Sequence, residues 1–285
     1  MPEGDTIFRT ARNLGRVLEG KPVTAFRSTF PWLMRFNNDT PLAGQCVNHV
    51  EARGKWLLVH FSGGGILASH LLMNGSWHIY RRGERWQVAR VHMRIVIANA
   101  EYEAVGFRVP VAKMHTAASL ERDLRVAHAE NDVLRAEFDG AAALKRLMAC
   151  GSEAIADALL DQSVVAGVGN VFKSEICFVN GLHPFRRVDS LTREEAAAAI
   201  AYAQKLLKAN VLEDSGDTIV TYRGQQRRTT HASDPSESLW VYGRAGEACR
   251  RCGEAIRRRI QGADARVTFW CPQCQAMPDG SDVDG

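Results

Sequence analysis

Four cysteines near the carboxyl end constrain this chain more than any other feature of its sequence. They form two Cys-x-x-Cys pairs, Cys249 with Cys252 and Cys271 with Cys274, separated by eighteen residues. Two such pairs can supply four thiolates in a tetrahedron around Zn²⁺, and this set leaves no ligand position open. The spacing therefore predicts a structural zinc ion. The alternative is that each pair is a redox Cys-x-x-Cys motif. The surrounding sequence disfavours this alternative, because it shows no thioredoxin-like βαβ pattern.

The stretch around these pairs is rich in arginine. Residues 255–260 and 265–270 can pair as a β-hairpin around Gly262-Ala263-Asp264. Over residues 244–266, seven arginines stand against three acidic residues. A basic hairpin held by zinc is suited to binding phosphate groups. A charge run of this kind is also typical of a solvated surface, and that reading stays open on the sequence alone.

The composition of the whole chain sets wider limits. With 285 residues, 46% of them hydrophobic, the chain suits two domains better than one. Its net charge of +4 permits a nucleic-acid partner without requiring one. The start of the chain lacks a signal pattern, no apolar run is long enough for a membrane span, and the cysteine set is odd and clustered. We therefore expect a cytoplasmic protein without a membrane partner, with a monomer as the default.

Hydrophobic periodicity divides the chain into two regions. Residues 5–19 are typical of an amphipathic helix that ends at Gly20. From about 22 to 110, short β-rich runs alternate with turns, which predicts an antiparallel sandwich or barrel. These runs are Trp56–Phe61, Ile66–Met73, Ser76–Tyr80 and His92–Ala98. From about 136 to 212 the chain is helical, with helices expected at 153–162, 170–180 and 191–212 and a capping box between Thr192 and Glu195.

A glycine-containing turn lies between two of the expected helices. Residues 165–170 read Val-Ala-Gly-Val-Gly-Asn, and the two glycines permit a close approach of backbone N–H groups to a ligand. Asn170 is placed to cap the helix that follows, and the start of a helix favours an anion. A Gly-x-Gly alone is weak evidence, and an ordinary connecting turn is the competing interpretation.

The start of the chain can carry chemistry. Removal of Met1 leaves Pro2 with a free secondary amine, whose pKa near ~8 leaves a useful neutral fraction at pH 7. Such an amine can attack a sugar C1′ and form an iminium, the covalent logic of Schiff-base enzymes. Glu3 stands beside it and can shuttle protons. Many proteins begin Met-Pro-Glu, so an ordinary terminus is the alternative on these residues alone.

Taken together, these motifs resemble one known family. MPEG at 1–4, RGK at 53–55, LLDQSVVAGVGNVFKSEICF at 159–178, VYGRAGE at 241–247 and the four cysteines are similar to the formamidopyrimidine-DNA glycosylase/endonuclease VIII family. The resemblance runs from Met1 to about Met277, with all motifs in the family's order. It implies an α+β fold, in which an N-terminal β-sandwich with flanking helices precedes a helical domain that holds a helix–two-turn–helix and a zinc finger hairpin, with DNA between the domains.

The residue pattern and the resemblance together divide the chain. We expect a catalytic β-sandwich domain at 1–125, a weakly periodic linker at 126–136, the helix–two-turn–helix domain at 137–213, a polar loop at 214–238, the zinc finger at 239–277 and an acidic tail at 278–285. In relatives the loop position holds a damage-sensing lid. No individual role is assigned to residues of this loop.

The resemblance implies a bifunctional DNA glycosylase and AP lyase of base excision repair. Pro2 looks like the nucleophile that displaces the damaged base at C1′, and Glu3 looks like the acid/base that assists ring opening and proton transfer. Schiff-base chemistry then drives β- and δ-elimination. Lys55 looks like the family's lysine, whose ammonium contacts phosphate near the lesion. Read in isolation, Lys55 is an ordinary hairpin residue.

The same resemblance implies contacts with damaged DNA, either duplex or partly single-stranded. Asn170 and Arg266 look like the family's phosphate contacts, and Lys173 in the same helix as Asn170 is a further candidate. These contacts would help to extrude the target nucleotide. Met73 looks like the apolar wedge that fills the gap left in the base stack. An ordinary sheet-core methionine is the alternative that periodicity alone favours.

Some positions identify a branch of the family and others depart from its pattern. Gly4 is similar to the residue that the endonuclease VIII branch has at this position. This similarity implies that the substrates are oxidised pyrimidines and not 8-oxoguanine or formamidopyrimidines. Asp5 and Thr6 stand where many members have Pro-Glu, so the second carboxylate often found at position 6 is absent. The sequence shows no clear arginine wedge near 104–114. The alternatives are a purine-specific glycosylase, a DNA-binding protein of this fold without catalysis, and a zinc-ribbon structural protein that leaves Pro2 unexplained.

The cysteine spacing predicts one zinc ion per chain. Metal analysis of the purified protein should find zinc at about one equivalent, because all four thiolates are committed to a closed tetrahedral site. Purified, folded protein without bound metal would contradict the zinc finger.

Overall fold

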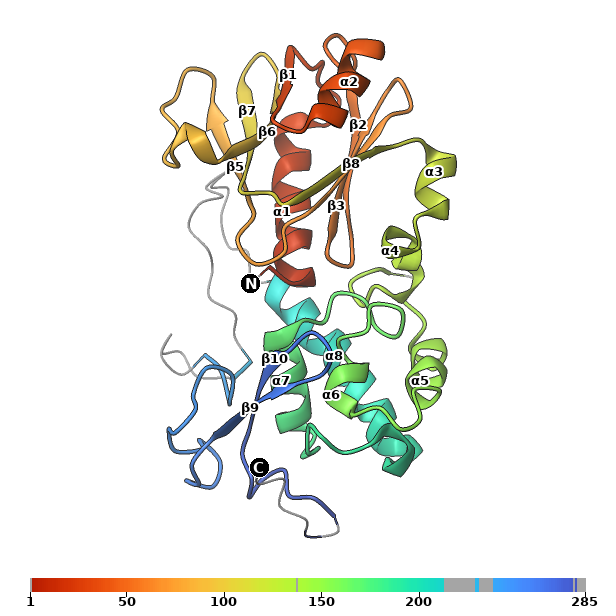
Figure 1. The fold of residues 1–285 in the computed structure, drawn as a ribbon, viewed down its shortest axis with the longest axis vertical. Helices are drawn as coiled ribbons and strands as arrows, with labels where there is room; N and C mark the ends of the chain where they lie inside the picture. The colour runs from red at the N-terminus through yellow and green to blue at the C-terminus, as the bar shows by residue number, and fades with distance from the viewer. Residues whose placement is uncertain (1, 137, 213–228, 231–237, 279, 281–285) are drawn as a thin grey trace. The chain divides into compact units, whose positions relative to one another are not determined.

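The computed structural model describes residues 2–136, 138–212, 229–230, 238–278 and 280 (Figure 1). The chain forms two compact units. The described residues of unit 1 lie within Met1–Ala129, and those of unit 2 lie within Glu130–Leu212 and Gln225–Gly285. Most of the expected loop at 214–238 and of the tail at 278–285 lies outside the described residues.

Unit 1 is built from two four-stranded antiparallel sheets. One has the order β1-β6-β7-β5 and the other β2-β3-β4-β8. The strands are β1 (Ala25–Ser28), β2 (Val47–Arg53), β3 (Trp56–Phe61), β4 (Ile66–His70), β5 (Ser76–Arg81), β6 (Met93–Ala98), β7 (Tyr102–Phe107) and β8 (Val111–His115). Because the sheets are separate, the sandwich is confirmed and the barrel alternative is wrong. The predicted run Ile66–Met73 was too long, since the strand ends at His70 and a loop follows.

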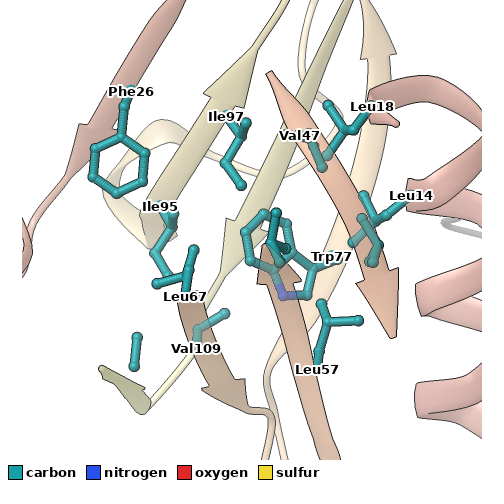
Figure 2. Packing of buried hydrophobic residues seen from close by; sticks show 14 of the residues in the cluster. Leu14, Leu18, Phe26, Val47, Leu57, Leu67, Trp77, Ile95, Ile97 and Val109 are labelled. Carbon is teal, nitrogen blue, oxygen red and sulfur yellow. The ribbon is translucent and has the colours of Figure 1, made fainter. Parts of the chain in front are cut away.

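Apolar side chains from both sheets fill the interior of the sandwich. Leu57 and Leu67 from one sheet meet Ile95, Ile97 and Trp77 from the other, all buried (Figure 2). These strands are rich in β-branched and aromatic residues, which fit a pleated, half-buried surface. The β-rich runs in the sequence therefore coincide with the strands that form this core.

Helix α1 (Gly4–Leu18) covers part of this core. Its buried face carries Ile7, Leu14 and Leu18 at helical spacing, as the sequence predicts. Gly20 follows with φ 72°, a left-handed conformation that disfavours a side chain, and it turns the chain away. α1 packs against β2 and β3 (Figure 1).

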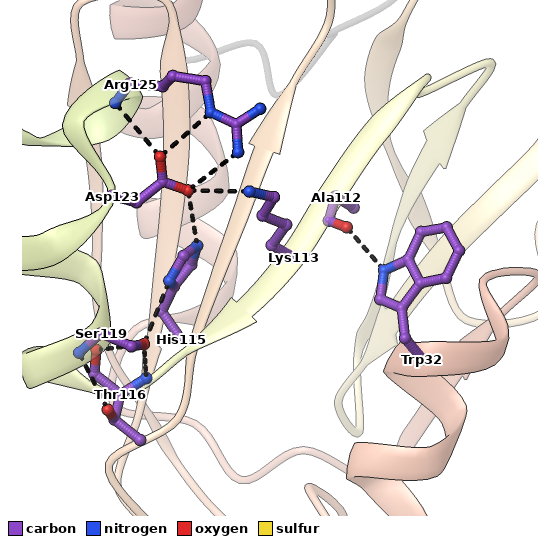
Figure 3. A network of polar contacts seen from close by, with 8 residues as sticks. All are labelled: Trp32, Ala112, Lys113, His115, Thr116, Ser119, Asp123 and Arg125. Carbon is purple, nitrogen blue, oxygen red and sulfur yellow. Dashed lines mark hydrogen bonds and ion pairs between the residues drawn. The ribbon is translucent and has the colours of Figure 1, made fainter.

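Short helices complete unit 1: α2 (Pro31–Asp39), η1 (Arg90–His92), α3 (Ala117–Arg122) and α4 (Leu124–Ala127). Asp123, between α3 and α4, accepts hydrogen bonds from the Lys113 ammonium at 2.9 Å and from Arg125 (Figure 3). Although burial opposes it, these bonds lower the pKa of Asp123 to about 2. His115 lies 3.9 Å from the same carboxylate. These contacts hold the α3–α4 segment against strand β8.

Unit 2 is helical, with a hairpin at its end. It contains α5 (Gly140–Met148), α6 (Ile155–Ala158), α7 (Asn170–Val179), η3 (Val188–Ser190), α8 (Arg193–Leu212), β9 (Arg257–Gln261) and β10 (Arg266–Trp270), and η2 (His128–Asn131) joins it to unit 1. The capping box before α8 is confirmed. The Thr192 N–H donates to Glu195 at 2.8 Å, and the Glu195 N–H donates to the Thr192 hydroxyl at 3.2 Å.

The helix predicted at 153–162 was wrong in extent, because α6 ends at Ala158. Polar side chains bend the chain after it. The Asp161 carboxylate accepts from the Ser163 N–H at 2.7 Å, and Gln162 Nε2 donates to the carbonyls of Leu160 and Val168. These local bonds compete with helix propagation.

No helix in the described part of the chain has the length and apolar character that a membrane crossing requires.

Candidate functional site

Pro2 and Glu3 lie at the start of α1. Glu3 is fully buried and occupies the N-cap position, but its side chain does not cap the helix. Asp5 is also fully buried, within the first turn, where the Arg9 guanidinium contacts its carboxylate at 3.2 Å. The Thr6 hydroxyl donates to Asp5 at 3.3 Å. Asp5 is therefore engaged within its own helix.

Lys55 lies in the tight turn between β2 and β3. Gly54 precedes it with φ 57°, a conformation that glycine adopts without strain. The end of α1 meets the start of β2, because the N–H of Gly20, just after the helix, donates to the Val47 carbonyl at 2.8 Å. A 15-residue helix and a seven-residue strand both span roughly 20 Å. α1 packs along β2, so the start of α1 and the β2–β3 turn lie at the same end of unit 1 (Figure 1). Pro2 and Glu3 therefore belong to the same end as Lys55.

The hairpin that carries Lys55 is stiffened by contacts of the Glu51 carboxylate. Glu51 Oε1 lies 2.7 Å from Arg53 in the same strand, and it lies 3.0 Å from His60 Nε2 across the β2–β3 pair. Burial opposes ionisation, but the hydrogen bonds from His60 and Arg53 prevail and lower the pKa of Glu51 to about 2. A carboxylate held in this way limits the motion of the turn.

His70 lies beside Lys55 and was not predicted from the sequence as a site residue. His70 pairs with Trp56, the residue that follows Lys55. Burial and the neighbouring Lys55 charge lower the pKa of His70 to about 4, so its ring is neutral at pH 7. Its Nδ1 accepts a hydrogen bond from the Leu72 N–H at 3.1 Å. The only sequence signal was its position at the end of a β-rich run.

The loop after His70 carries the predicted wedge. Met73 is 57% exposed, so the alternative of a sheet-core methionine is wrong. Leu72, 46% exposed, has φ 46°, a strained value for a residue with a side chain. Gly75 closes the loop against the Leu71 carbonyl, where a Cβ would approach to 2.7 Å. We name residues 71–75 the wedge loop.

A second loop lies beside the wedge loop. Ser76 pairs with Phe107 and His70 pairs with Val111, so the chain between β7 and β8 flanks the wedge loop. Arg108 begins this second loop, is exposed, and has φ 49°. The sequence analysis did not identify an arginine here, because neither the strand pairing nor this backbone conformation can be read from local sequence.

In unit 2 the four cysteines converge as the spacing predicts. Their sulfur atoms all lie within 4.8 Å of one another. The Sγ–Sγ distances are 3.9 Å for Cys249–Cys274 and 3.4 Å for Cys252–Cys271. A tetrahedron with Zn–S bonds of about 2.3 Å requires sulfur atoms about 3.8 Å apart. The cluster therefore has the donor set and the spacing for a metal ion.

Asn170 and Arg266 are brought together at the hairpin. Gly169 is the N-cap of α7, so the prediction that Asn170 caps this helix was wrong by one residue. The Asn170 amide Nδ2 instead donates to the carbonyl of Val267, the neighbour of Arg266 in β10, at 2.9 Å. The preceding turn uses Gly167 at φ 98°, where its N–H donates to Gln162. Lys173 in the same helix is fully buried, so a direct contact with DNA would require its ammonium to be uncovered.

Glu175 is a second residue that sequence reasoning missed. It is fully buried in α7, and its two carboxylate oxygens accept from the backbone N–H groups of Trp240, Val241 and Tyr242 at 2.8–2.9 Å. The Thr229 hydroxyl donates to the same carboxylate. Several donors on one buried carboxylate offset its desolvation, and they hold residues 240–243, which we name the VYG segment, against α7.

Two family models match the sequence. The formamidopyrimidine-DNA glycosylase N-terminal domain matches residues 1–109, and the formamidopyrimidine-DNA glycosylase H2TH domain matches residues 130–222. The chain is 40% identical to a probable endonuclease 8 2 of Streptomyces coelicolor over 98% of this chain and 95% of that protein. It is 36% identical to the DNA-(apurinic or apyrimidinic site) lyase Nei2 of Mycolicibacterium smegmatis, covering 96% of this chain and 99% of that protein.

Solved structures share the fold. A complex between the Lactococcus lactis Fpg and abasic-site DNA aligns with a TM-score of 0.79 at 21% identity, covering 96% of this chain and all of that one. A complex of the same protein with DNA that contains an oxidised pyrimidine also aligns with a TM-score of 0.79. At this identity the likeness establishes the fold alone. It confirms the α+β class, with a sandwich, a helix–two-turn–helix domain and a C-terminal hairpin.

The neutral state of His70 predicts a pH dependence of stability. The unfolded chain has a histidine pKa near 6.5, whereas the folded value is about 4. Between these values the unfolded state binds more protons, so the free energy of unfolding falls as the pH is lowered through this window. His70→Asn, whose amide oxygen can still accept from the Leu72 N–H, should show a weaker decline between pH 6.5 and 4. The effect is at most about 3 kcal/mol.

Urea unfolding at several pH values measures this difference. Equal pH dependence in the two proteins would show that His70 titrates normally in the folded state.

Proposed function

Because this chain belongs to the formamidopyrimidine-DNA glycosylase/endonuclease VIII family, we propose that it is a bifunctional DNA glycosylase and AP lyase of base excision repair. The observation that carries the proposal is the position of Pro2 and Glu3 at the same end of unit 1 as Lys55 and the wedge loop. A nucleophilic amine, a buried carboxylate, a cation and an exposed apolar wedge are the groups that excision of an extruded base requires.

The chemistry begins at the amine of Pro2 after Met1 is removed. The neutral nitrogen attacks C1′ of the damaged nucleotide, and the bond between C1′ and the base breaks with its electron pair leaving on the base. Glu3 transfers protons to assist opening of the sugar ring, which leaves an iminium between Pro2 and C1′. Loss of a C2′ proton then expels the 3′ phosphate, and a second elimination expels the 5′ phosphate.

Lys55 supports this chemistry as a fixed positive charge. Its ammonium lies on a turn that the Glu51 contacts restrain, and His70 beside it is neutral. A phosphate next to the lesion would meet a compact cation whose position is fixed before binding, so little reorganisation accompanies the reaction.

Unit 2 supplies phosphate contacts. Asn170 Nδ2 uses one hydrogen on the Val267 carbonyl and retains a second for a phosphate oxygen. Arg266 follows the hairpin turn, and its side chain is 37% exposed. Zn²⁺ held by the four cysteines would be structural, because it fixes the hairpin base and has no open ligand position.

We favour oxidised pyrimidines as the substrate class within damaged DNA. Gly4 is the residue of the endonuclease VIII branch, and the similar proteins of Streptomyces coelicolor and Escherichia coli are named endonucleases 8, the latter at 33% identity. An 8-oxoguanine- or formamidopyrimidine-specific glycosylase is the second candidate. The two matching family models favour it, because both are named for formamidopyrimidine-DNA glycosylase.

Variants at the start of α1 test the proposed chemistry. Pro2→Gly replaces the secondary amine, and Glu3→Gln removes the proton-transferring carboxylate, so both should lower base excision by at least about 100-fold. Duplexes with thymine glycol, dihydrouracil or 8-oxoguanine serve as substrates, and thermal unfolding checks that each variant is folded. Normal excision by a folded Pro2→Gly and a folded Glu3→Gln variant would contradict this mechanism. Faster cleavage of 8-oxoguanine than of the pyrimidine lesions would overturn the substrate class alone.

A further inference from the structure

The large apolar side chains that unit 1 exposes to solvent gather at one end of its sandwich. Among the described residues of the chain, the exposed ones are Trp32, Leu72, Met73, Val91 and Ile260, and the first four belong to unit 1. Leu72 and Met73 lie in the wedge loop. Exposed apolar groups that converge in this way mark an interaction surface more often than scattered ones do.

Hydrogen bonds place Trp32 and Val91 near the wedge loop. The Trp32 indole Nε1 donates to the Ala112 carbonyl at 2.8 Å (Figure 3). Ala112 follows Val111, whose strand partner His70 is the last residue before the wedge loop. Val91 precedes His92, whose carbonyl accepts from the Arg108 N–H at 2.8 Å. All these groups therefore lie at the end of the sandwich where β4 and β7 stop.

The Trp32 ring is held in place although 54% of the residue is exposed. Its polar N–H is bonded to the sheet, and its ring centroid lies 4.9 Å from that of the buried Phe30. A ring fixed in this way presents a flat surface to solvent without losing conformational entropy on binding.

A cation accompanies this aromatic pair. The Arg94 guanidinium lies over the Phe30 ring at 4.7 Å from the centroid, and the Arg94 carbonyl accepts from the Thr29 N–H at 2.9 Å. Within the described chain Arg94 forms no ion pair. Its positive charge therefore lies one aromatic ring away from Trp32, because the Phe30 ring neighbours both residues.

We propose that the exposed Trp32 ring stacks an unpaired nucleobase, in the DNA strand that continues past the wedge loop, and that Arg94 supplies a positive charge one aromatic ring away. An exposed aromatic ring combined with nearby positive charge is a device with which proteins hold single-stranded nucleic acid. A single ring and its neighbours are too small for a stable protein interface, which buries about 1,200 Å² or more. The inference rests on the proposed function, and it predicts that unpaired bases near the lesion strengthen binding.

Fluorescence of 2-aminopurine tests this site directly. The base is placed in turn at each position of a small bubble that flanks a non-cleavable abasic-site analogue. Stacking on the indole should quench its emission at one position of the bubble when the full-length protein binds. Trp32→Ala should abolish that quenching and weaken binding of the bubble DNA by about tenfold. Trp32→Phe retains a flat ring and should keep most of the affinity, although it lacks the N–H bond to Ala112.

Matched substrates and an Arg94 variant separate stacking from a folding effect. Trp32→Ala should bind the fully paired duplex nearly as well as the wild type, and Arg94→Gln should lower the salt dependence of bubble binding. Quenching that persists in Trp32→Ala would overturn the proposal. So would equal losses for Trp32→Ala and Trp32→Phe, or equal losses on bubble and duplex.

Cleavage of abasic-site DNA by the wild type distinguishes failure of this site from failure of the proposed function. Cleavage without quenching at any bubble position removes the stacking site and leaves the repair activity intact. A protein that neither cleaves abasic-site DNA nor quenches 2-aminopurine would contradict the proposed repair function itself.

Discussion

The antiparallel register of the unit 1 sheets is the constraint on which its chemistry depends. Trp56 pairs with His70, His70 with Val111, and Ser76 with Phe107. These pairings place three separate turns at one end of the sandwich: the Lys55 turn, the wedge loop and the loop that begins at Arg108. A slip of one residue in any pair would move these side chains to the opposite face. The site is therefore a product of strand pairing, with α1 adding Pro2 and Glu3 at the same end.

In unit 2, buried polar groups hold the segments around the β9–β10 hairpin against α7. The Glu175 carboxylate collects backbone donors from the VYG segment, and Asn170 bonds the carbonyl next to Arg266. The cysteine cluster fixes the other end of the same hairpin. Since a two-stranded hairpin is marginal on its own, these attachments and a bound metal would supply the rigidity that a phosphate contact needs.

Local patterns in the sequence predicted the features that depend on local chemistry. The Thr192–Glu195 capping box, the apolar face of α1 and the convergence of the four cysteines were all confirmed, because each depends on residues a few positions apart or on a fixed ligand chemistry. The zinc ion itself stays a prediction. The family motifs predicted the fold class, which the solved structures confirm at the level of the fold. The roles of Pro2, Glu3 and Lys55 stay predictions.

Features that depend on distant contacts could not be predicted. Asn170 looked like a helix cap because nothing in its neighbourhood reveals that Val267, ninety-seven positions away, offers a carbonyl. Helix 153–162 was predicted too long, since Asp161 and Gln162 bond the backbone locally. His70 and Arg108 gain their positions from strand pairing and from a left-handed backbone at Arg108. Met73 and Trp32 are likewise exposed because they lie near the ends of strands, and hydrophobic periodicity in the sequence does not locate those ends.

Borohydride trapping shows whether the Pro2 amine forms the covalent intermediate. Protein shown by mass spectrometry to have lost Met1 is incubated with abasic-site DNA and reduced. We expect a stable DNA–protein adduct whose peptide map places the modification on Pro2. An adduct on a lysine, or no adduct with protein that binds the same DNA, would contradict this role of Pro2.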